Sequence, residues 1–225
     1  MKKIGMLVAV EIQAVLDKYG SRLEEVDRSG YAVKILRTEN YELYILKSGA
    51  GEISAAAGVQ FLITKYGVDF ILNFGVVGGL TPEMALAKTC VVEKVVHYDY
   101  DTSEIDGTRV GQYNGYEDEF IHCDKALVEA ALKLQPELKA VTCASADKFV
   151  GDPARKAALH EQFGADICER EAAGILLTCR RNGVPCLMIK TVSDSISGGA
   201  DEFTKEVNRS AGICLDVAEG LMEIL

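Results

Sequence analysis

The chain has 225 residues, of which 48% are hydrophobic and 26% charged, so it holds enough apolar material for one sizeable core. Its formal net charge of −10 argues against binding to a nucleic-acid backbone or to an anionic membrane surface. The first apolar run stops at Glu11 with no cleavage site of a signal peptide, and no run approaches the roughly 20 residues that span a bilayer.

The predicted elements begin with Ile4–Val10, a short and fully apolar run that is typical of a buried parallel strand. Apolar residues at helical spacing follow, and Gly20 is expected to end that helix. Two further strands, Tyr31–Arg37 and Tyr41–Lys47, flank three polar residues that suit a hairpin turn.

The middle of the chain alternates glycine-rich segments with regular elements. The turn Ser48–Gly51 leads into an alanine-rich helix, Glu52–Tyr66. Asp69–Phe74 has the pattern of a buried strand that runs into Gly75–Gly79, where glycines suit a tight turn close to backbone or ligand. A fourth buried strand is expected at Cys90–Val96.

A polar loop, Tyr98–Asp118, separates this part from the second half, which starts with a helix at Lys125–Leu134 capped by Asp124. The remaining predicted elements are a strand at Ala140–Ser145, helices at Pro153–Phe163 and Ala172–Asn182, a strand at Pro185–Val192, and a long closing helix at Ala200–Leu225.

This alternation predicts a three-layer α/β/α fold around a central mixed, largely parallel sheet, with residues 1–225 as one domain. The hairpin and the long loop suggest antiparallel additions. Ligands of such sheets gather where strands end. We therefore expect one cleft formed by the ends at Val10–Gln13, Ser48–Gly51, Gly75–Gly79 and Lys190–Asp194.

The seven cysteines are odd in number and form no Cys-x-x-Cys pair, which fits free thiols in a reducing cytoplasm. The three histidines lie in no cluster of zinc-binding spacing, so no metal is expected. Neither glycine-rich segment has the pattern of a P-loop or of a dinucleotide-binding turn, so no cofactor is implied.

Two polar segments carry the candidate chemistry. Glu169, Arg170 and Glu171 stand at a strand-to-helix junction, where a carboxylate is often only a partner of the helix dipole. Ser193 and Asp194 end an apolar strand, where either is also suited to cap the next segment of the chain. The residues alone leave both interpretations open.

Taken together, these segments resemble the methylthioadenosine/S-adenosylhomocysteine nucleosidase family, within the wider nucleoside phosphorylase superfamily. The resemblance covers nearly the whole chain and lies in the order and spacing of several short motifs. These are Lys3-Ile-Gly5, Ser48-Gly-Ala-Gly51, Asn73-Phe-Gly-Val-Val-Gly-Gly-Leu80, Ser145-Ala-Asp-Lys-Phe-Val150, Glu169-Arg-Glu-Ala172, Val192-Ser-Asp194 and the helix of Phe203.

The resemblance implies roles that suit cleavage of a purine N-glycosidic bond. Asp194 matches the acid that protonates the departing base, and Glu171 matches the carboxylate that binds the ribose hydroxyls. Phe149 matches the aromatic ring that stacks on the purine, and the backbone of Val150 reads the base edge. The motifs also put Ala50 and Ser193 among the substrate-binding positions.

The chain departs from the family where the attacking water is held. The glutamate base, the serine and the arginine of that subsite are replaced here by Gln13, Val76 and Lys190. Gln13 can orient a water but cannot take its proton. Glu11 is a candidate replacement base, although on a helix start its side chain and that of Gln13 point apart. Arg170 replaces an apolar residue beside the ribose and is a candidate ligand of Glu169, a ribose oxygen or an anion.

The resulting hypothesis is a nucleosidase that hydrolyses a 5′-modified adenosine such as methylthioadenosine or S-adenosylhomocysteine. Two alternatives stay open because of the altered subsite: a phosphate-dependent nucleoside phosphorylase, and a nucleoside-binding protein with weak or no catalysis. The resemblance also implies a homodimer, in which loop Tyr98–Asp118 brings Ile105 to the pocket of the second subunit.

Overall fold

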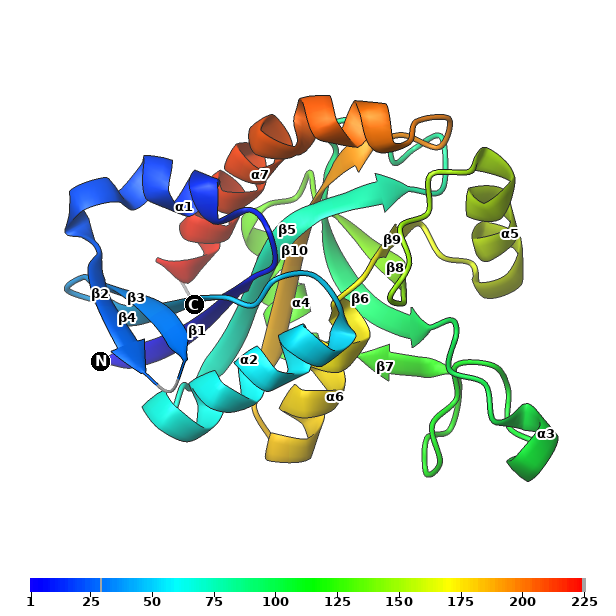
Figure 1. Ribbon diagram of the computed structural model, residues 1–225, viewed down its shortest axis with the longest axis horizontal. Helices are drawn as coiled ribbons and strands as arrows, with labels where there is room; N and C mark the ends of the chain where they lie inside the picture. Colours follow the sequence, from blue (N-terminus) through cyan, green and yellow to red (C-terminus); the bar gives the residue numbers. More distant parts are fainter. Residues whose placement is uncertain (29, 224–225) are drawn as a thin grey trace.

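A mixed sheet runs through the computed structural model, which describes residues 1–28 and 30–223, and helices pack on both of its sides (Figure 1). The strands are β1 (Lys2–Val8), β2 (Glu24–Arg28), β3 (Tyr31–Arg37), β4 (Tyr41–Lys47), β5 (Phe70–Gly79), β6 (Thr89–His97), β7 (Phe120–His122), β8 (Lys139–Ser145), β9 (Ile167–Glu169) and β10 (Cys186–Asp194). The helices are α1 (Ile12–Tyr19), α2 (Glu52–Tyr66), α3 (Ser103–Asp106), α4 (Lys125–Leu134), α5 (Pro153–Phe163), α6 (Ala172–Asn182) and α7 (Ala200–Met222), with a short 3₁₀ turn at Gly20–Arg22.

The central part of the sheet is parallel. Strand β1 pairs in parallel with β4 on one side and β5 on the other, and β5 pairs in parallel with β10. The hairpin β3–β4 and the strands β2 and β7 add antiparallel pairs, as the sequence suggested for the hairpin and the long loop. The α/β class with a mixed sheet between helices is therefore confirmed.

One feature of the sheet was not predicted. Strand β10 also pairs with β6, β6 with β8, β8 with β9, and β9 pairs back with the end of β5. These five strands close into a ring, which brings the loops after β8 and β9 next to the carboxyl ends of β5 and β10.

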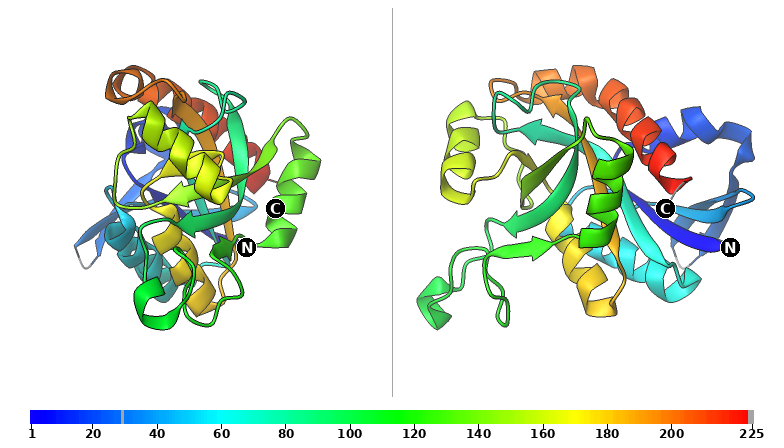
Figure 2. Two further views of the ribbon diagram at one scale, coloured as in Figure 1. Left: turned by 90° about the vertical axis from the view of Figure 1, so that its right-hand side faces the viewer. Right: turned by 180° about the vertical axis from the view of Figure 1, so that it is seen from behind.

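Helices α1 and α7 lie on one side of the sheet, and α2 and α6 on the other (Figure 1). Helix α5 lies beyond the ends of β8 and β9, and the segment with α3 projects away from the rest of the molecule (Figures 1 and 2). The main apolar core surrounds the central strands, and a second, smaller cluster joins α5 to β8 and β9.

Local sequence signals explain most helix ends. Asp124 accepts a hydrogen bond from the backbone N–H of Leu127 at 3.0 Å and caps α4 as predicted. Asp152 caps α5 in the same way, with Pro153 in the first helical turn. The bounds predicted for α2, α4, α5 and α6 agree with the structure at both ends. The last two residues of the predicted closing helix lie outside the described residues.

The prediction of a turn at Gly75–Gly79 was wrong, because these residues continue β5 as extended, fully buried strand. Their glycines serve close packing. A Cβ atom on Gly75 would lie 2.9 Å from the Glu11 carboxylate, and one on Gly78 would lie 3.0 Å from that of Asp194. The turn at Ser48–Gly51 is present, and Gly49 and Gly51 adopt positive φ angles there.

Candidate active site

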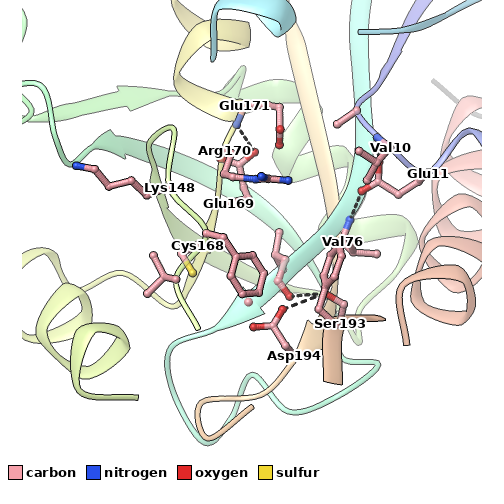
Figure 3. Close-up of a pocket in the computed structure, with 16 residues that line it drawn as sticks. Val10, Glu11, Val76, Lys148, Cys168, Glu169, Arg170, Glu171, Ser193 and Asp194 are labelled. Atoms are coloured by element: carbon pink, nitrogen blue, oxygen red, sulfur yellow. Dashed lines mark hydrogen bonds between the residues drawn. The ribbon is translucent and has the colours of Figure 1, made fainter. Parts of the chain in front are cut away.

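A cavity that is open to solvent lies where the carboxyl ends of β1, β5 and β10 meet the loops after β8 and β9. Figure 3 shows the side chains of these segments around one space. The lining residues are Ala9, Val10, Glu11, Val76, Val77, Gly78, Lys148, Phe149, Val150, Cys168, Glu169, Arg170, Glu171, Ser193, Asp194 and Phe203. Three of the four predicted strand ends thus contribute to its wall.

Asp194 ends β10 and lies buried at one end of this cavity. The hydroxyl of Ser193 donates to its Oδ1 atom at 3.1 Å, and the ammonium of Lys156 donates to its Oδ2 atom at 2.6 Å. Burial raises the pKa of Asp194 above its ordinary value, and Lys156 opposes this shift. The carboxyl group is therefore held at both oxygens by donors, while its burial favours the protonated form.

Glu171 lies at the opposite end of the same cavity, just before helix α6 (Figure 3). Its Oε1 atom accepts a hydrogen bond from the backbone N–H of Gly51 at 2.8 Å, which connects it to the turn Ser48–Gly51. Burial, followed by the nearby charge of Glu169, raises the pKa of Glu171 to about 7. The two carboxyl groups that the sequence singled out thus share one cavity.

Glu169 is the carboxylate that bonds to the start of helix α6, which is one of the two roles that the sequence left open for this segment. Its carboxylate accepts hydrogen bonds from the backbone N–H groups of Glu171 at 3.0 Å and of Ala172 at 3.0 and 3.1 Å. These are free N–H groups at the start of α6. Glu169 therefore fixes the helix start, and this fixes the position of Glu171.

Glu11 is buried against the cavity at the end of β1. Its Oε2 atom accepts from the backbone N–H of Val10, and its Oε1 atom accepts from that of Val76, both at 2.9 Å. The side chain of Val76 offers no hydrogen bond, but its backbone holds a carboxylate in the subsite. A potential proton acceptor is thus present next to β5.

Lys190 lies behind the cavity wall in β10, almost fully buried. Its ammonium is 3.4 Å from Oε2 of Glu169. Burial alone lowers the pKa of Lys190, but the carboxylates of Glu169, Glu171 and Glu11 outweigh it, so the net pKa is raised. Lys190 therefore stays charged and offsets the negative charge of this acidic group.

Two aromatic rings form an apolar wall near Asp194. Phe149, which is 45% exposed, contacts Phe203 of α7 edge-on with 5.7 Å between ring centroids. The buried side chain of Val150 and the thiol-bearing residue Cys168 complete this part of the lining. A flat heterocycle can stack against such a wall.

Two cations also line the cavity. Lys148 is paired with Asp99 at 3.0 Å. Arg170 is partly buried, and in the described part of the chain it has no ion pair or side-chain hydrogen bond. Its guanidinium points into the cavity between Glu171 and Glu11 (Figure 3). Of the partners that the sequence suggested for Arg170, Glu169 is not bound by its side chain, which leaves a ribose oxygen or an anion from outside the chain.

Besides Lys190, which lies behind the cavity wall, three of the predicted site residues lie away from it. Gln13 is exposed on α1, where its amide donates to Asp17 at 2.7 Å. Ala50 is exposed in the turn before α2, and Ile105 is 88% exposed in α3. Glu11 and Gln13 do point apart, as expected, and it is Glu11 that faces inward.

Sequence reasoning missed Lys156 and Glu52, which are buried beside the site. A weak signal exists for Lys156, because it lies three residues before the buried Leu159 and thus on the inner face of α5. Glu52, in the first turn of α2, looked like an ordinary acidic residue at a helix start.

The cavity thus has Asp194 at one end, Glu171 at the other, and the Glu11 carboxylate, held by backbone N–H groups, on its wall. An acid can protonate a leaving group, and negative charge can stabilise a cationic sugar. The geometry therefore suits cleavage of a bond between a heterocycle and a sugar.

The chain matches the family model of the phosphorylase superfamily over residues 3–223. It is 32% identical to an aminodeoxyfutalosine nucleosidase of Campylobacter jejuni over 222 residues, which cover 95% of each chain. It is 34% identical to a 5′-methylthioadenosine/S-adenosylhomocysteine nucleosidase of Geobacillus kaustophilus over 200 residues, which cover 85% of this chain and 84% of that one.

Solved structures agree with these relatives. A structure of a futalosine hydrolase mutant of Helicobacter pylori superposes with a TM-score of 0.93 at 26% identity, and both chains are covered fully. A mutant nucleosidase of the same organism, solved with 5′-methylthioadenosine in its active site, gives a TM-score of 0.92 at 27% identity with both chains covered fully.

Proposed function

The chain belongs to the phosphorylase superfamily, and on this premise we propose that it is a nucleosidase that hydrolyses the N-glycosidic bond of a 5′-modified adenosine. Methylthioadenosine, S-adenosylhomocysteine and aminodeoxyfutalosine, which its relatives' names give as substrates, are the candidate substrates. All three combine an adenine base, a ribose and a different 5′ group.

The observation that carries this proposal is the shared cavity of Asp194 and Glu171. In the proposed reaction the C1′–N9 bond breaks and its electron pair moves to the base. Asp194 then gives its proton to a purine nitrogen, an effect typically worth about 10²–10⁴-fold in rate. Glu171 binds the ribose hydroxyls, and the negative charge around it stabilises the cationic sugar. Phe149 and Val150 hold the base, with Ser193 fixing the acid.

We assign the activation of water to Glu11 rather than to Gln13. The Glu11 carboxylate accepts two backbone N–H groups and lies beside the cavity, so it can accept the proton of a water that attacks C1′. Lys190 stays charged close to this carboxylate and limits the build-up of negative charge. Because Glu11 supplies a proton acceptor beside the cavity, we disfavour the alternative of a nucleoside-binding protein without catalysis.

Phosphorolysis remains the second candidate function because of Arg170. Its guanidinium faces the cavity without an ion pair in the described residues, and phosphate is one of the anions that suit it. Phosphate as nucleophile needs no base, so Glu11 would then be dispensable for turnover.

Incubating the purified protein with each candidate nucleoside, with and without phosphate, tests this assignment. Hydrolysis predicts free adenine at the same rate in both buffers, together with the unphosphorylated sugar. Adenine that appears only with phosphate, together with the sugar 1-phosphate, supports phosphorolysis. Intact nucleoside after long incubation, bound tightly by calorimetry, would contradict both.

We further propose one domain over residues 1–225 and a cytoplasmic homodimer. The cysteines are buried and unpaired, which suits a reducing compartment. In the described part of the chain no helix is long and apolar enough to cross a membrane.

The exposed Ile105 on the projecting α3 suits a contact that completes the 5′ end of a neighbour's cavity. Light scattering of the wild type and of Ile105→Glu tests this, with a monomeric wild type as the contradicting result.

A further inference from the structure

Lys156 is a lysine with no exposed surface, which is unusual for this residue type. It belongs to α5, and its three N–H donors have three acceptors: Oδ2 of Asp194 at 2.6 Å, and the carbonyl oxygens of Ser195 at 2.6 Å and Gly198 at 3.1 Å. A buried ammonium is tolerated only where it is paired and fully hydrogen bonded. This site meets both conditions.

The contact ties α5 to the end of β10 and to the loop that leads into α7. With Ser193 on Oδ1 and Lys156 on Oδ2, the Asp194 carboxyl group has a donor at each oxygen. Gly78 of β5 leaves the space for this pair, since a Cβ atom there would lie 3.0 Å from Oδ2 of Asp194 and 3.5 Å from Nζ of Lys156. The plane of the carboxyl group is therefore fixed before any ligand enters.

Opposing charges surround Asp194. Burial favours the protonated form, as does the charge of Glu202 on α7, whereas Lys156 favours the carboxylate. The thiol of Cys168 on β9 is also close, but burial raises the pKa of Cys168 to about 12, so it is neutral. The carboxylate of Glu202 is itself held by the backbone N–H of Ser195 at 2.6 Å. Lys156 is thus the cation that faces the acid directly.

We propose that Lys156 is a positioning residue for Asp194, whose ammonium fixes the carboxyl group and stabilises the carboxylate that remains once its proton has passed to the base. The inference rests on the proposed function, in which Asp194 is the acid. In this step the Asp194 O–H bond breaks, a purine N–H bond forms, and the new carboxylate stays paired with the unchanged Lys156 ammonium. A buried acid without this cation would release its proton less readily.

The test compares Lys156→Met and Lys156→Arg with the wild type on two substrates. One is 5′-methylthioadenosine, and the other is the 4-nitrophenyl glycoside of 5-methylthioribose, whose leaving group departs as a stable anion without a proton. Asp194→Asn shows which limb of the pH profile belongs to the acid, because that limb should be absent in this variant. Lys156→Gln serves as the second neutral variant if the methionine variant does not fold.

We expect the neutral variants to lose tenfold or more in kcat on the nucleoside and to stay within about threefold of the wild type on the nitrophenyl glycoside. The alkaline limb of their kcat–pH profile should move up by about 1–3 pH units, since removing a cation lets the acid hold its proton to higher pH. Lys156→Arg keeps the charge and should restore the wild-type limb. Equal losses on both substrates with an unmoved limb would overturn the inference. A wild type that releases no base from any nucleoside would instead count against the proposed function.

Discussion

Glu52 and Glu169 both contact the hydroxyl group of Ser145, so two buried carboxyl groups meet at a single O–H donor. A hydroxyl can donate to only one of them, and the other must then carry a proton and donate in turn. Burial, followed by the charge of Glu169, raises the pKa of Glu52 to about 8, which marks it as the protonated partner. This pair fastens α2 to the start of α6 beneath Glu171.

Replacing Glu52 by Gln is expected to flatten the pH dependence of folding stability. The pKa of Glu52 is higher in the folded protein, about 8, than its ordinary value of 4.5, so the folded state keeps a proton that the unfolded chain releases between these values. Stability from this group is present at low pH and is lost as pH rises through that window, by up to about 1.4 kcal/mol per pH unit. Urea unfolding at about pH 5 and about pH 8 should therefore show a smaller loss for Glu52→Gln than for the wild type. An equal loss in both proteins would contradict the assignment.

Glu11→Gln should abolish most turnover while leaving binding intact. The amide keeps the size of the side chain but cannot take a proton from water, so kcat should fall by about 10²–10⁴-fold. Calorimetry with 5′-methylthioadenosine should give a Kd close to that of the wild type. Gln13→Ala is the matched control, because Gln13 is exposed and its amide donates to Asp17 of the same helix. A larger effect from Gln13→Ala than from Glu11→Gln would reverse the assignment.

Gly78→Ala should lower kcat by crowding Asp194. The added Cβ atom would lie 3.0 Å from its Oδ2 atom and 3.1 Å from the sulfur of Cys168, so the acid must shift. A displacement of this kind is expected to cost about tenfold or more in rate. Gly212→Ala in α7 is the control, since nothing lies within 4 Å of its Cβ position and alanine there favours the helix by about 0.5–1 kcal/mol. Equal kcat values for the two variants would show that the fit around Gly78 is unimportant.

Arg170→Met should weaken the binding of an anion in the cavity. A methionine removes the cavity-facing cation, so phosphate should bind about tenfold more weakly, a loss of about 1.4 kcal/mol. Neutral 5′-methylthioadenosine should bind with little change. Competition assays with both ligands, and Lys148→Met as a second variant, separate the two cations. If all ligands lose affinity equally, Arg170 acts on the ribose instead.

The regular elements could be predicted because their signals are local. Buried apolar runs identified the long strands, Asp124 identified the start of α4, and Gly20 identified the end of α1. Strand β2 was missed because Glu24–Arg28 is short and mostly charged, and it forms only by pairing with β3. The three-residue strands β7 and β9 likewise depend on their neighbours.

The site could be predicted only in part, since side-chain direction depends on contacts between distant segments. The family pattern pointed to Gln13 as the residue at the water subsite, but the hydrogen bond from the backbone of Val76 turns Glu11 inward. Lys156 was missed because a lysine in a helix is normally solvated, and only the approach of β10 supplies its acceptors. The glycines of β5 looked like a turn because their true neighbours, Glu11 and Asp194, are far away in the sequence.

The ring of five strands leaves β2 at the outer border of the sheet, where unpaired backbone groups invite a strand from another molecule. This border strand is mostly charged, and two of its acidic side chains are paired with cations of β3, Glu24 with Arg37 and Glu25 with Lys34. A foreign strand docking there would have to bring charges that match the acidic side chains of Glu24 and Glu25. The charges that made this short strand hard to predict therefore also disfavour aggregation along the edge of the sheet.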